Sequence, residues 1–417
     1  MRTATLVVLL TFLTLSITVA YAESEPVVEW RQMFGGSGHE VGFTACETSD
    51  GNYIMIGATE SYDAGNGDIW LVKADPNGNE LWNKTFGGPA WECGRSIIET
   101  SDGNYLLAGG TESFVDEYDR DVWLIKTDPD GNVLWNKTFG GSGKDDSWSV
   151  QETNDCGYVI VGCTDSFSAH NRSIFDLNAV EYLDVLLIKT DQDGNEEWIR
   201  TFGGGSYDLG YSGQQTNDGG YIITGVTKSY GNGFGDFWLI KTDSNGYEEW
   251  NRTFGGANDE YSRSVRQTSD VGYIIVGDTG VRNNASYDVW LVKTDSNGYE
   301  EWNRTFGEPA RTVDVPSFGS ITTTGHDHGS SVQETQDGGY VIAGNTASYG
   351  SYIGDIWLIK TDSDGYEEWN VTSNIRGTDE AFSVQETSDG GYIVAGDTSR
   401  GDYGGMDFWL WKFGYEN

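Results

Sequence analysis

The chain has 417 residues, of which 65 are acidic and 25 are Lys or Arg, so its formal net charge at pH 7 is −40. A surface of this charge repels nucleic acid and anionic lipid, which argues against both as partners. The 58 glycines and only six prolines predict many tight turns and few rigid linkers.

The first 22 residues have the pattern of a secretory signal peptide. Arg2 supplies a positive end, residues 6–20 are apolar, and Ala20-Tyr21-Ala22 fits a small-x-small cleavage site. The alternative is an uncleaved N-terminal anchor, because the apolar stretch is nearly as long as a membrane span. No second apolar stretch follows, so we expect a secreted or cell-surface protein with no membrane span after cleavage.

A unit of about 50 residues recurs through the rest of the chain. Its most regular segment is Asp-x-Trp-Leu-x-Lys, with Leu in place of Trp in the third copy. The anchor aspartates lie 52 to 67 residues apart, at Asp68, Asp121, Asp184, Asp236, Asp288, Asp355 and Asp407. This period, built from short strands, is typical of a β-propeller in which each repeat forms one four-stranded blade.

The fifth unit shows the plan of a blade. We predict strand A over residues 263–268, strand B over 273–278, strand C over 289–294 and strand D over 302–306. The A–B turn keeps an Asp and a Tyr in every unit, and Gly or Asn between them is expected to supply the positive φ of a tight hairpin. Strands B and C are nearly continuous apolar runs, so neighbouring blades must cover both of their faces.

The two ends of the chain are out of phase with the blades. Residues 27–34 match strand D, whereas the chain stops after a strand C at residues 408–413. Pairing the two closes the ring and removes an exposed edge. We therefore predict an all-β, seven-bladed propeller of four antiparallel strands per blade, in one domain over 23–417. The expected blades cover residues 41–87, 93–140, 146–203, 209–255, 261–307, 328–373, and 380–413 plus 27–34.

Several motifs resemble those of known propeller families. The Gly-Gly-Tyr turns and aromatic strands are similar to kelch and galactose-oxidase-like blades, and Asp243–Trp250 resembles the tryptophan-docking repeat of quinoprotein propellers. The Asp-Gly-Gly-Tyr-Ile repeat resembles those of archaeal and bacterial secreted surface propellers, over about the whole mature chain. The resemblance implies the fold and carries almost no information on function. The copper ligands of galactose oxidase have no counterpart here.

The two faces of the predicted ring differ in loop length. The A–B and C–D turns are short and uniform, whereas the B–C and D–A loops vary. We call the second face the variable face. Two insertions, between Thr164 and Asp184 and between Phe306 and Asp327, are expected to arch over the channel mouth. Variable loops on a rigid scaffold are where binding usually resides.

An acidic residue recurs seven residues before the end of each strand A. We call this set the acid ring: Glu40, Glu92, Asp145, Asp208, Glu260, Asp327 and Asp379. One hypothesis is a cation or polar-ligand site at the channel mouth. The alternative is structural, with each acid bonded to loop amides or to a hydroxyl four residues on: Thr44, Ser96, Ser149, Ser212, Ser264, Ser331 and Ser383. Repetition in every unit favours the structural role, since a binding site usually breaks symmetry.

Metal sites have two further candidates. His326 and His328 follow the longer insertion and would suit a transition metal if another loop added a ligand. The C–D turns repeat Asp-x-Asn/Asp-Gly, which resembles half of a calcium loop but lacks the distal bidentate Glu. An Asx-type hairpin turn explains these turns more simply. No cofactor is expected, and Ca²⁺ or another divalent cation remains the alternative.

Export would permit glycans and disulfides. Asn-x-Ser/Thr sequons occur at Asn83, Asn136, Asn171, Asn251, Asn284, Asn303 and Asn370. Five share one strand-D position, where Thr alternatively reflects a preference for β structure. Among the four cysteines, Cys93 and Cys163 are the best candidate pair, and free buried thiols are the favoured alternative.

Catalytic motifs such as a nucleophile elbow, a phosphate loop or a metalloprotease helix are missing from the sequence. We therefore expect a monomeric binding or structural module without catalytic activity. Its variable face would engage an extracellular glycan, protein or matrix component. The alternative is a polysaccharide hydrolase or lyase that uses two acid-ring carboxylates with His326 or His328. A carboxylate with a strongly raised pKa beside a second acid at the mouth would favour the enzyme.

Overall fold

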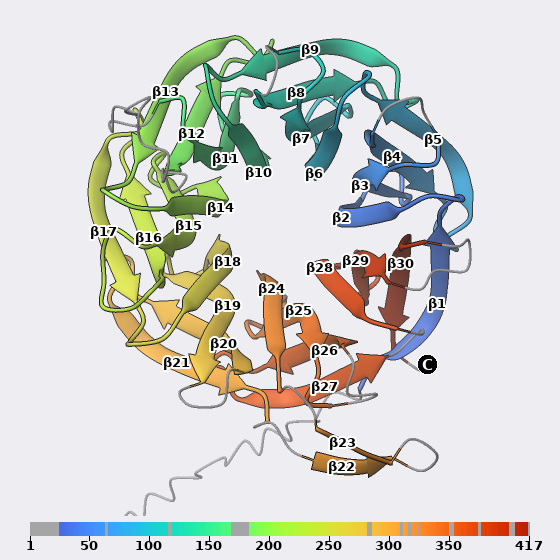
Figure 1. The fold of residues 1–417 in the computed structure, drawn as a ribbon, viewed down its shortest axis with the longest axis vertical. Helices are drawn as coiled ribbons and strands as arrows, with labels where there is room; N and C mark the ends of the chain where they lie inside the picture. The colour runs from blue at the N-terminus through green and yellow to red at the C-terminus, as the bar shows by residue number, and fades with distance from the viewer. Residues whose placement is uncertain are drawn as a thin grey trace, which may run out of the picture.

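The computed structural model describes residues 25–62, 66–115, 119–167, 183–281, 286–308, 312–315, 319–322, 325–349, 354–373, 377–399 and 405–415. Their strands form seven four-stranded antiparallel sheets around a central channel (Figure 1). The prediction of a seven-bladed propeller is confirmed. The predicted signal peptide, residues 1–22, lies outside the described residues and stays a prediction. No helix in the described part of the chain is long and apolar enough to span a membrane.

Six blades are continuous in sequence, and each runs from inner strand A to outer strand D. They are β2 Glu40–Glu47, β3 Tyr53–Thr59, β4 Asp68–Ala74, β5 Glu80–Phe86; β6 Glu92–Glu99, β7 Tyr105–Thr111, β8 Asp121–Thr127, β9 Val133–Phe139; β10 Asp145–Glu152, β11 Tyr158–Thr164, β12 Asp184–Thr190, β13 Glu196–Phe202; β14 Asp208–Gln215, β15 Tyr221–Thr227, β16 Asp236–Thr242, β17 Glu248–Phe254; β18 Glu260–Gln267, β19 Tyr273–Val281, β20 Ser286–Thr294, β21 Glu300–Phe306; and β24 Asp327–Glu334, β25 Tyr340–Thr346, β26 Asp355–Thr361, β27 Glu367–Ser373.

The seventh blade joins the two ends of the chain. It contains β28 (Asp379–Glu386), β29 (Tyr392–Thr398) and β30 (Asp407–Gly414), with β1 (Val27–Phe34) as its outer strand (Figure 1). In the antiparallel pair, Met33 lies opposite Trp409 and Phe34 opposite Phe408. The side chain of Phe34 is buried in a cluster with Trp70 and Phe408, so the first and last blades share one core. The predicted closure is confirmed.

The core lies between blades rather than within one sheet. Strands B and C are buried along nearly their whole length, as in β16, where every residue is buried. Each apolar cluster joins strands of adjacent blades; for example, Ile222 and Phe237 pack with Ile275 and Val292. Large aromatic side chains between blades bury much apolar area and favour specific ring contacts, such as Phe237 with Trp290 at 4.7 Å.

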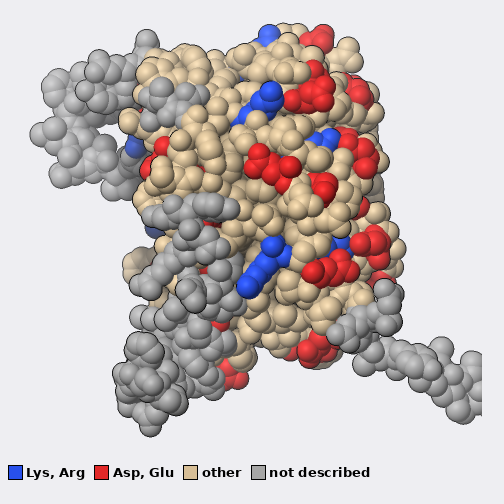
Figure 2. Space-filling model, turned by 90° about the vertical axis from the view of Figure 1, so that its right-hand side faces the viewer, with Lys and Arg blue, Asp and Glu red and all other residues tan. Residues whose placement is uncertain are grey.

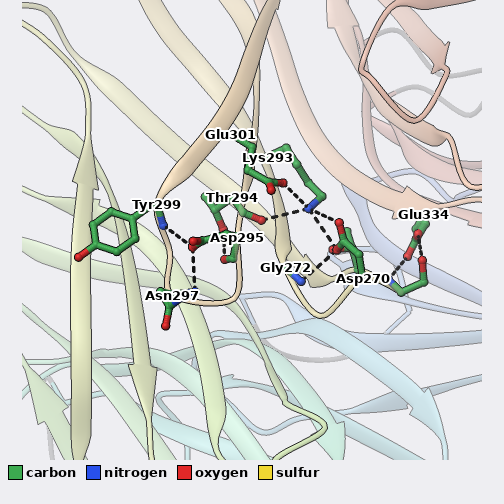
Figure 3. A network of polar contacts seen from close by, with 11 residues as sticks. Asp270, Gly272, Lys293, Thr294, Asp295, Asn297, Tyr299, Glu301 and Glu334 are labelled. Atoms are coloured by element: carbon green, nitrogen blue, oxygen red, sulfur yellow. Dashed lines mark hydrogen bonds and ion pairs between the residues drawn. The ribbon is translucent and has the colours of Figure 1, made fainter.

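One lysine on each strand C is buried beside the A–B turn. The seven are Lys73, Lys126, Lys189, Lys241, Lys293, Lys360 and Lys412. In the fifth blade, Lys293 Nζ lies 2.9 Å from Asp270 Oδ2 and 3.1 Å from Glu301 Oε2 (Figure 3). Although burial alone would raise it, hydrogen bonds from Lys293 and Thr268 lower the pKa of Asp270 to about 2. The repeated Lys of strand C and the repeated Asp of the turn are therefore partners.

The last residue of each inner strand binds the turn of the preceding blade. Glu334 accepts hydrogen bonds from the backbone N and the hydroxyl of Ser269, at 2.8 and 2.6 Å (Figure 3). Glu47 makes the same pair of bonds with Ser388, across the junction of the first and seventh blades. These contacts recur between all neighbouring blades on the turn face.

The C–D turns are Asx turns, as predicted. Asp295 Oδ1 accepts backbone N–H groups of Asn297 and Tyr299 at 2.8 and 2.9 Å (Figure 3). Gly298 in the same turn has a φ of 76°, a backbone conformation that residues with a Cβ rarely adopt. These aspartates therefore hold the turn through backbone amides.

The A–B turns depart from expectation in two blades. The positive φ falls on the residue directly after the Asp, and this residue is Gly in five units but Cys156 (63°) and Val271 (65°) in the other two. The glycine that follows Val271 has a different role. A Cβ added at Gly272 would lie 2.2 Å from the carbonyl oxygen of Thr294, so the close approach to strand C requires glycine there.

The longer insertion does not arch over the channel. Its described residues form a hairpin of β22 (Thr312–Val315) and β23 (Gly319–Thr322), which lies outside the ring beyond the outer strands (Figure 1). This part of the prediction is wrong, because loop length alone does not fix the direction in which a loop leaves a blade. Residues 168–182 of the other insertion lie outside the described residues. All four cysteines are free thiols, so Cys93 and Cys163 are not paired.

Candidate functional site

The acid ring occupies the variable-face end of the inner strands, but its side chains are buried. Glu92 is fully buried and accepts hydrogen bonds from Gly88 N at 2.8 Å and from the Thr111 hydroxyl at 2.9 Å. The hydroxyl partner ends strand B and is not the residue four positions after the acid. That residue, Ser96, accepts the N–H of Val150 in the next blade at 3.2 Å. Corresponding backbone bonds to the acid recur around Glu40, Asp145, Asp208 and Glu260.

The anchor aspartates lie close to the acid ring at the seams between blades. A Cβ added at Gly87 would lie 1.7 Å from Asp68 Oδ1 and 2.8 Å from Glu92 Oε2, so glycine is needed to bring the two acids together. Burial and the negative charge of Asp327 raise the pKa of Asp288 to about 6 at the equivalent seam. The contacts of the acid ring do not favour a ligand site, and that hypothesis stays a prediction.

A β-bulge interrupts every inner strand at the same place. The register of strand A against strand B shifts between the residues on either side of one position in each blade. We call the residues at this position the bulge ring: Phe43, Arg95, Trp148, Tyr211, Arg263, Ser330 and Phe382. Bulges are common next to functional sites, where they redirect a side chain.

Six members of the bulge ring form a continuous arc of contacts around the channel. Phe382 and Phe43 have ring centroids 5.5 Å apart, and the guanidinium of Arg95 lies 4.9 Å from the ring of Phe43. Arg95 also lies 3.8 Å from the Trp148 ring. The arc continues from Trp148 to Tyr211, 5.1 Å apart, and ends with Arg263 at 6.0 Å from the Tyr211 ring. Ser330 leaves a gap between the two ends of the arc.

The bulge ring and the acid ring differ in symmetry. The acid ring repeats one chemical type in all seven blades, while the bulge ring combines four aromatic residues, two arginines and one serine. A scaffold needs the same contact at every seam, whereas a ligand without seven-fold symmetry needs different side chains around the channel. The bulge ring is therefore the better candidate for binding.

A cavity of about 320 Å³ adjoins the bulge ring. Its lining includes inner-strand residues of all seven blades, which places it in the channel, and it includes Trp148, Tyr211, Arg263, Ser330 and Phe382. The ring thus offers aromatic side chains, the guanidinium group of Arg263 and a hydroxyl to whatever enters this space. Aromatic faces and a few polar groups around a concave space are typical of small-ligand sites.

Ion pairs surround the bulge ring on the mouth side. Asp146 is buried, and its Oδ2 lies 3.4 Å from Arg120 and 3.9 Å from Arg95. In the fifth blade, Asp278 Oδ2 lies 3.4 Å from Arg263. The same oxygen lies 3.0 Å from His328 Nδ1. These acids fix the guanidinium groups of both bulge-ring arginines.

The two histidines lie together at the mouth. Their rings are stacked, with centroids 6.2 Å apart and planes within 8°. Tyr287 contacts both of them, at 5.7 and 5.8 Å. Burial and the neighbouring charge of His328 lower the pKa of His326. Across the described residues, no group of three or more His, Cys, Asp or Glu side chains is arranged to hold a metal ion, so the metal hypothesis gains no support.

A pair of acids in the seventh blade has unusual electrostatics. Glu380 and Asp397 lie directly opposite each other in the β28–β29 pair. Glu380 directly follows Asp379, the acid-ring member of this blade. Asp397 is 3% exposed. Burial, with the negative charges of Glu380 and Asp379, raises the pKa of Asp397 to about 8. This carboxyl group therefore holds a proton at neutral pH.

The Asn that five sequons share on strand D takes part in a small hydrogen-bond network on the outer strands. Asn251 Oδ1 accepts a hydrogen bond from Trp238 Nε1 at 3.3 Å, and its Nδ2 donates to Glu248 at 2.6 Å. Trp also donates to the sequon Asn at Asn83, Asn136, Asn303 and Asn370. The amide nitrogen that would carry a glycan at Asn251 is thus already bonded. Asn171 and Asn284 lie outside the described residues.

The bulge ring and the Glu380–Asp397 pair were not predicted from the sequence. A signal was present, because the residue three positions after each acid-ring member changes type from blade to blade, as does the residue one position after it. The search for repeated residues favoured the acids instead. The direction of these side chains depends on the bulge. A small residue precedes the bulge and Ser or Thr follows it in every unit, but this pattern does not by itself predict a bulge.

Comparisons with known proteins identify no family for this chain. No family model and no curated protein sequence matches the chain. Among solved structures, Sqt1 from Chaetomium thermophilum is 11% identical, with 88% of this chain and 82% of that chain covered and a TM-score of 0.45. BBS1N in complex with ARL6DN is 11% identical, covering 93% and 97%, with a TM-score of 0.46. An α-L-arabinofuranosidase from Fusarium graminearum is 14% identical, covering 77% and 92%, with a TM-score of 0.45.

Proposed function

We propose that this protein is a secreted or cell-surface binding module without catalytic activity, which engages a glycan at the channel mouth of the variable face. The observation that carries the proposal is the asymmetric arc of the bulge ring. Its aromatic residues present apolar faces, and its arginines are held in place by buried acids.

A sugar is the ligand that this chemistry fits best. Sugar rings have an apolar face that packs on aromatic side chains, and hydroxyl groups that accept hydrogen bonds from guanidinium groups. The cavity of about 320 Å³ suits a terminal sugar residue or two. A folded protein partner would instead cover roughly 800 Å² of surface, which a cavity inside the channel does not offer.

The surface charge supports an extracellular partner other than nucleic acid. Acidic side chains are spread over the side of the ring, with Lys and Arg only interspersed among them (Figure 2). A phosphate backbone would be repelled along this flank. A neutral or acidic glycan would reach the two arginines only at the channel mouth, which confines binding to that place.

The test is a glycan panel titrated against the mature chain by calorimetry. Trp148→Ala removes the ring that contacts both Arg95 and Tyr211, and we expect at least a tenfold loss of affinity. Tyr299→Ala is the matched control, because Tyr299 is an exposed aromatic residue in a turn of the opposite face. Equal affinity of both variants for the bound glycan would contradict the proposal.

A second candidate function is a polysaccharide hydrolase or lyase, which one observation favours. A protonated Asp397 beside Glu380 is the arrangement of a general acid and a second carboxylate. Incubation of the wild-type chain with the same glycans, followed by a reducing-end assay and an assay for unsaturated products, tests it. Turnover that Asp397→Asn abolishes would replace the binding proposal with the enzymatic one.

A further inference from the structure

We propose that Arg266 forms an oxyanion-binding site inside the channel, below the bulge ring, for a carboxylate or sulfate group of the ligand. The ligand class is then an acidic saccharide, with a uronic acid or a sulfate ester as the anionic group. This inference deepens the proposed function and rests on it for the saccharide, while the anion site itself rests on separate observations.

The first observation is the position of Arg266 in the repeat. It lies three residues after Arg263 on β18, one layer deeper in the channel, and four other blades have Gln at this place: Gln151, Gln214, Gln333 and Gln385. Three of these glutamines accept the backbone N–H of the next inner strand, at 2.7 to 2.9 Å. Arginine has no acceptor atom, so Arg266 cannot make this bond.

The second observation is that Arg266 has no acidic partner. Its Nη1 donates to the carbonyl oxygen of Val265 at 2.8 Å and lies 3.5 Å from Ser212 Oγ, and no ion pair to it occurs among the described residues. By contrast, all seven strand-C lysines lie within 4 Å of a carboxylate. Burial lowers the pKa of the Arg266 guanidinium, and no acid counteracts the effect.

An unpaired guanidinium is unusual in a chain of this composition. Arg266 is half-buried, and this chain has 65 acidic residues from which a partner could come. An anion in the channel would supply the missing partner, because a guanidinium forms strong paired hydrogen bonds with carboxylate or sulfate oxygens.

The third observation is the space around Arg266. The residue lines both the cavity of about 320 Å³ below the bulge ring and a second channel cavity of about 450 Å³. Arg263 lines the first of these cavities, so a second cation lies on the same strand. Hydroxyl groups, including those of Ser331 and Ser383, line both. The channel thus has room for an anionic group beside Arg266.

The test measures binding of sodium sulfate and sodium glucuronate to the mature chain, with sodium chloride at matched ionic strength and glucose as references. We expect saturable stabilisation of the wild-type chain by at least one of the two anions and none by glucose. Arg266→Gln should reduce that affinity at least tenfold. The fold tolerates this change because Gln occupies the same place in four blades. Arg304→Gln, on an outer strand, is the control and should bind as the wild type does.

The outcomes separate the two proposals. Sulfate binding without glucuronate binding assigns a sulfated ligand, and the reverse assigns a uronate. Wild-type anion affinity in Arg266→Gln, or no saturable anion binding at all, would overturn the site. Wild-type glycan affinity in Trp148→Ala would contradict the proposed function and leave the anion site standing.

Discussion

The turn face and the variable face of this propeller differ in how strictly their residues repeat from blade to blade. On the turn face, a buried lysine, the A–B turn aspartate and the end of the next inner strand repeat in every blade. On the variable face, the acid ring also repeats and is buried, but the bulge ring beside it changes residue type from blade to blade. The repeated contacts join neighbouring blades. We interpret the bulge ring, where the residue type changes from blade to blade, as the candidate for binding.

The largest effect is expected from opening the ring. Deleting residues 25–34 removes β1, uncovers the edge of β30 and exposes the cluster around Phe34 and Trp70. We expect a loss of about 5 kcal/mol or more in the free energy of unfolding, because several buried apolar side chains become exposed. Urea denaturation followed by tryptophan fluorescence measures it. A melting temperature equal to that of the wild type would contradict the closed ring.

The next effect is expected from the turn face and should be the same in different blades. Lys293→Met keeps the volume of the side chain but leaves Asp270 and Glu301 without their cation, at a cost of about 2 kcal/mol. Lys73→Met should cost a similar amount. The two changes lie in separate blades, so their costs in the double variant should add. Chemical denaturation tests this, and very different single costs would argue against equivalent seams.

A pH effect should separate the variable face from the turn face. The pKa of Asp397 is raised in the folded state to about 8, so the folded chain binds a proton that the unfolded chain has released above pH ~4. Stability from this group is present at low pH and is lost as pH rises toward 8. Asp397→Asn should flatten this slope and raise the melting temperature at pH 8 by roughly 5 °C. An unchanged pH profile in the variant would refute the raised pKa.

Acid should act on the turn face in the opposite direction. The pKa of Asp270 is lowered to about 2, as is that of Asp389, so the stability that they contribute is present above pH ~4 and is lost as pH falls toward 2. In Lys293→Met the loss of stability on acidification should be smaller than in the wild type, because Asp270 of the fifth blade no longer pairs with a lysine. Melting curves between pH 2 and 5 measure the difference.

The smallest effect is expected from shortening the longer insertion. Deleting residues 311–325 places Asp327 six residues after Phe306, the spacing that the other D–A links have. Since the β22–β23 hairpin lies outside the ring, we expect a change within about 0.5 kcal/mol and unchanged glycan affinity. A loss of cooperative unfolding would show that the hairpin supports the blade.

The fold could be predicted from the sequence because its determinants are repeated. The anchor aspartates, the Tyr after each A–B turn and the phase of residues 27–34 were enough for blade number and closure. The acid ring was found for the same reason, yet repetition marks structural contacts. The bulge ring depends on the direction of single side chains, and Asp397 depends on burial beside Glu380. Neither the burial of Asp397 nor the direction of a side chain at a bulge follows from the residue types alone.

The most direct test compares one residue from each ring in a single glycan titration with melting curves alongside. The account predicts that Trp148→Ala abolishes binding at a nearly unchanged melting temperature, whereas Glu92→Gln lowers the melting temperature and keeps the affinity. Loss of affinity in Glu92→Gln with full binding by Trp148→Ala would contradict the account.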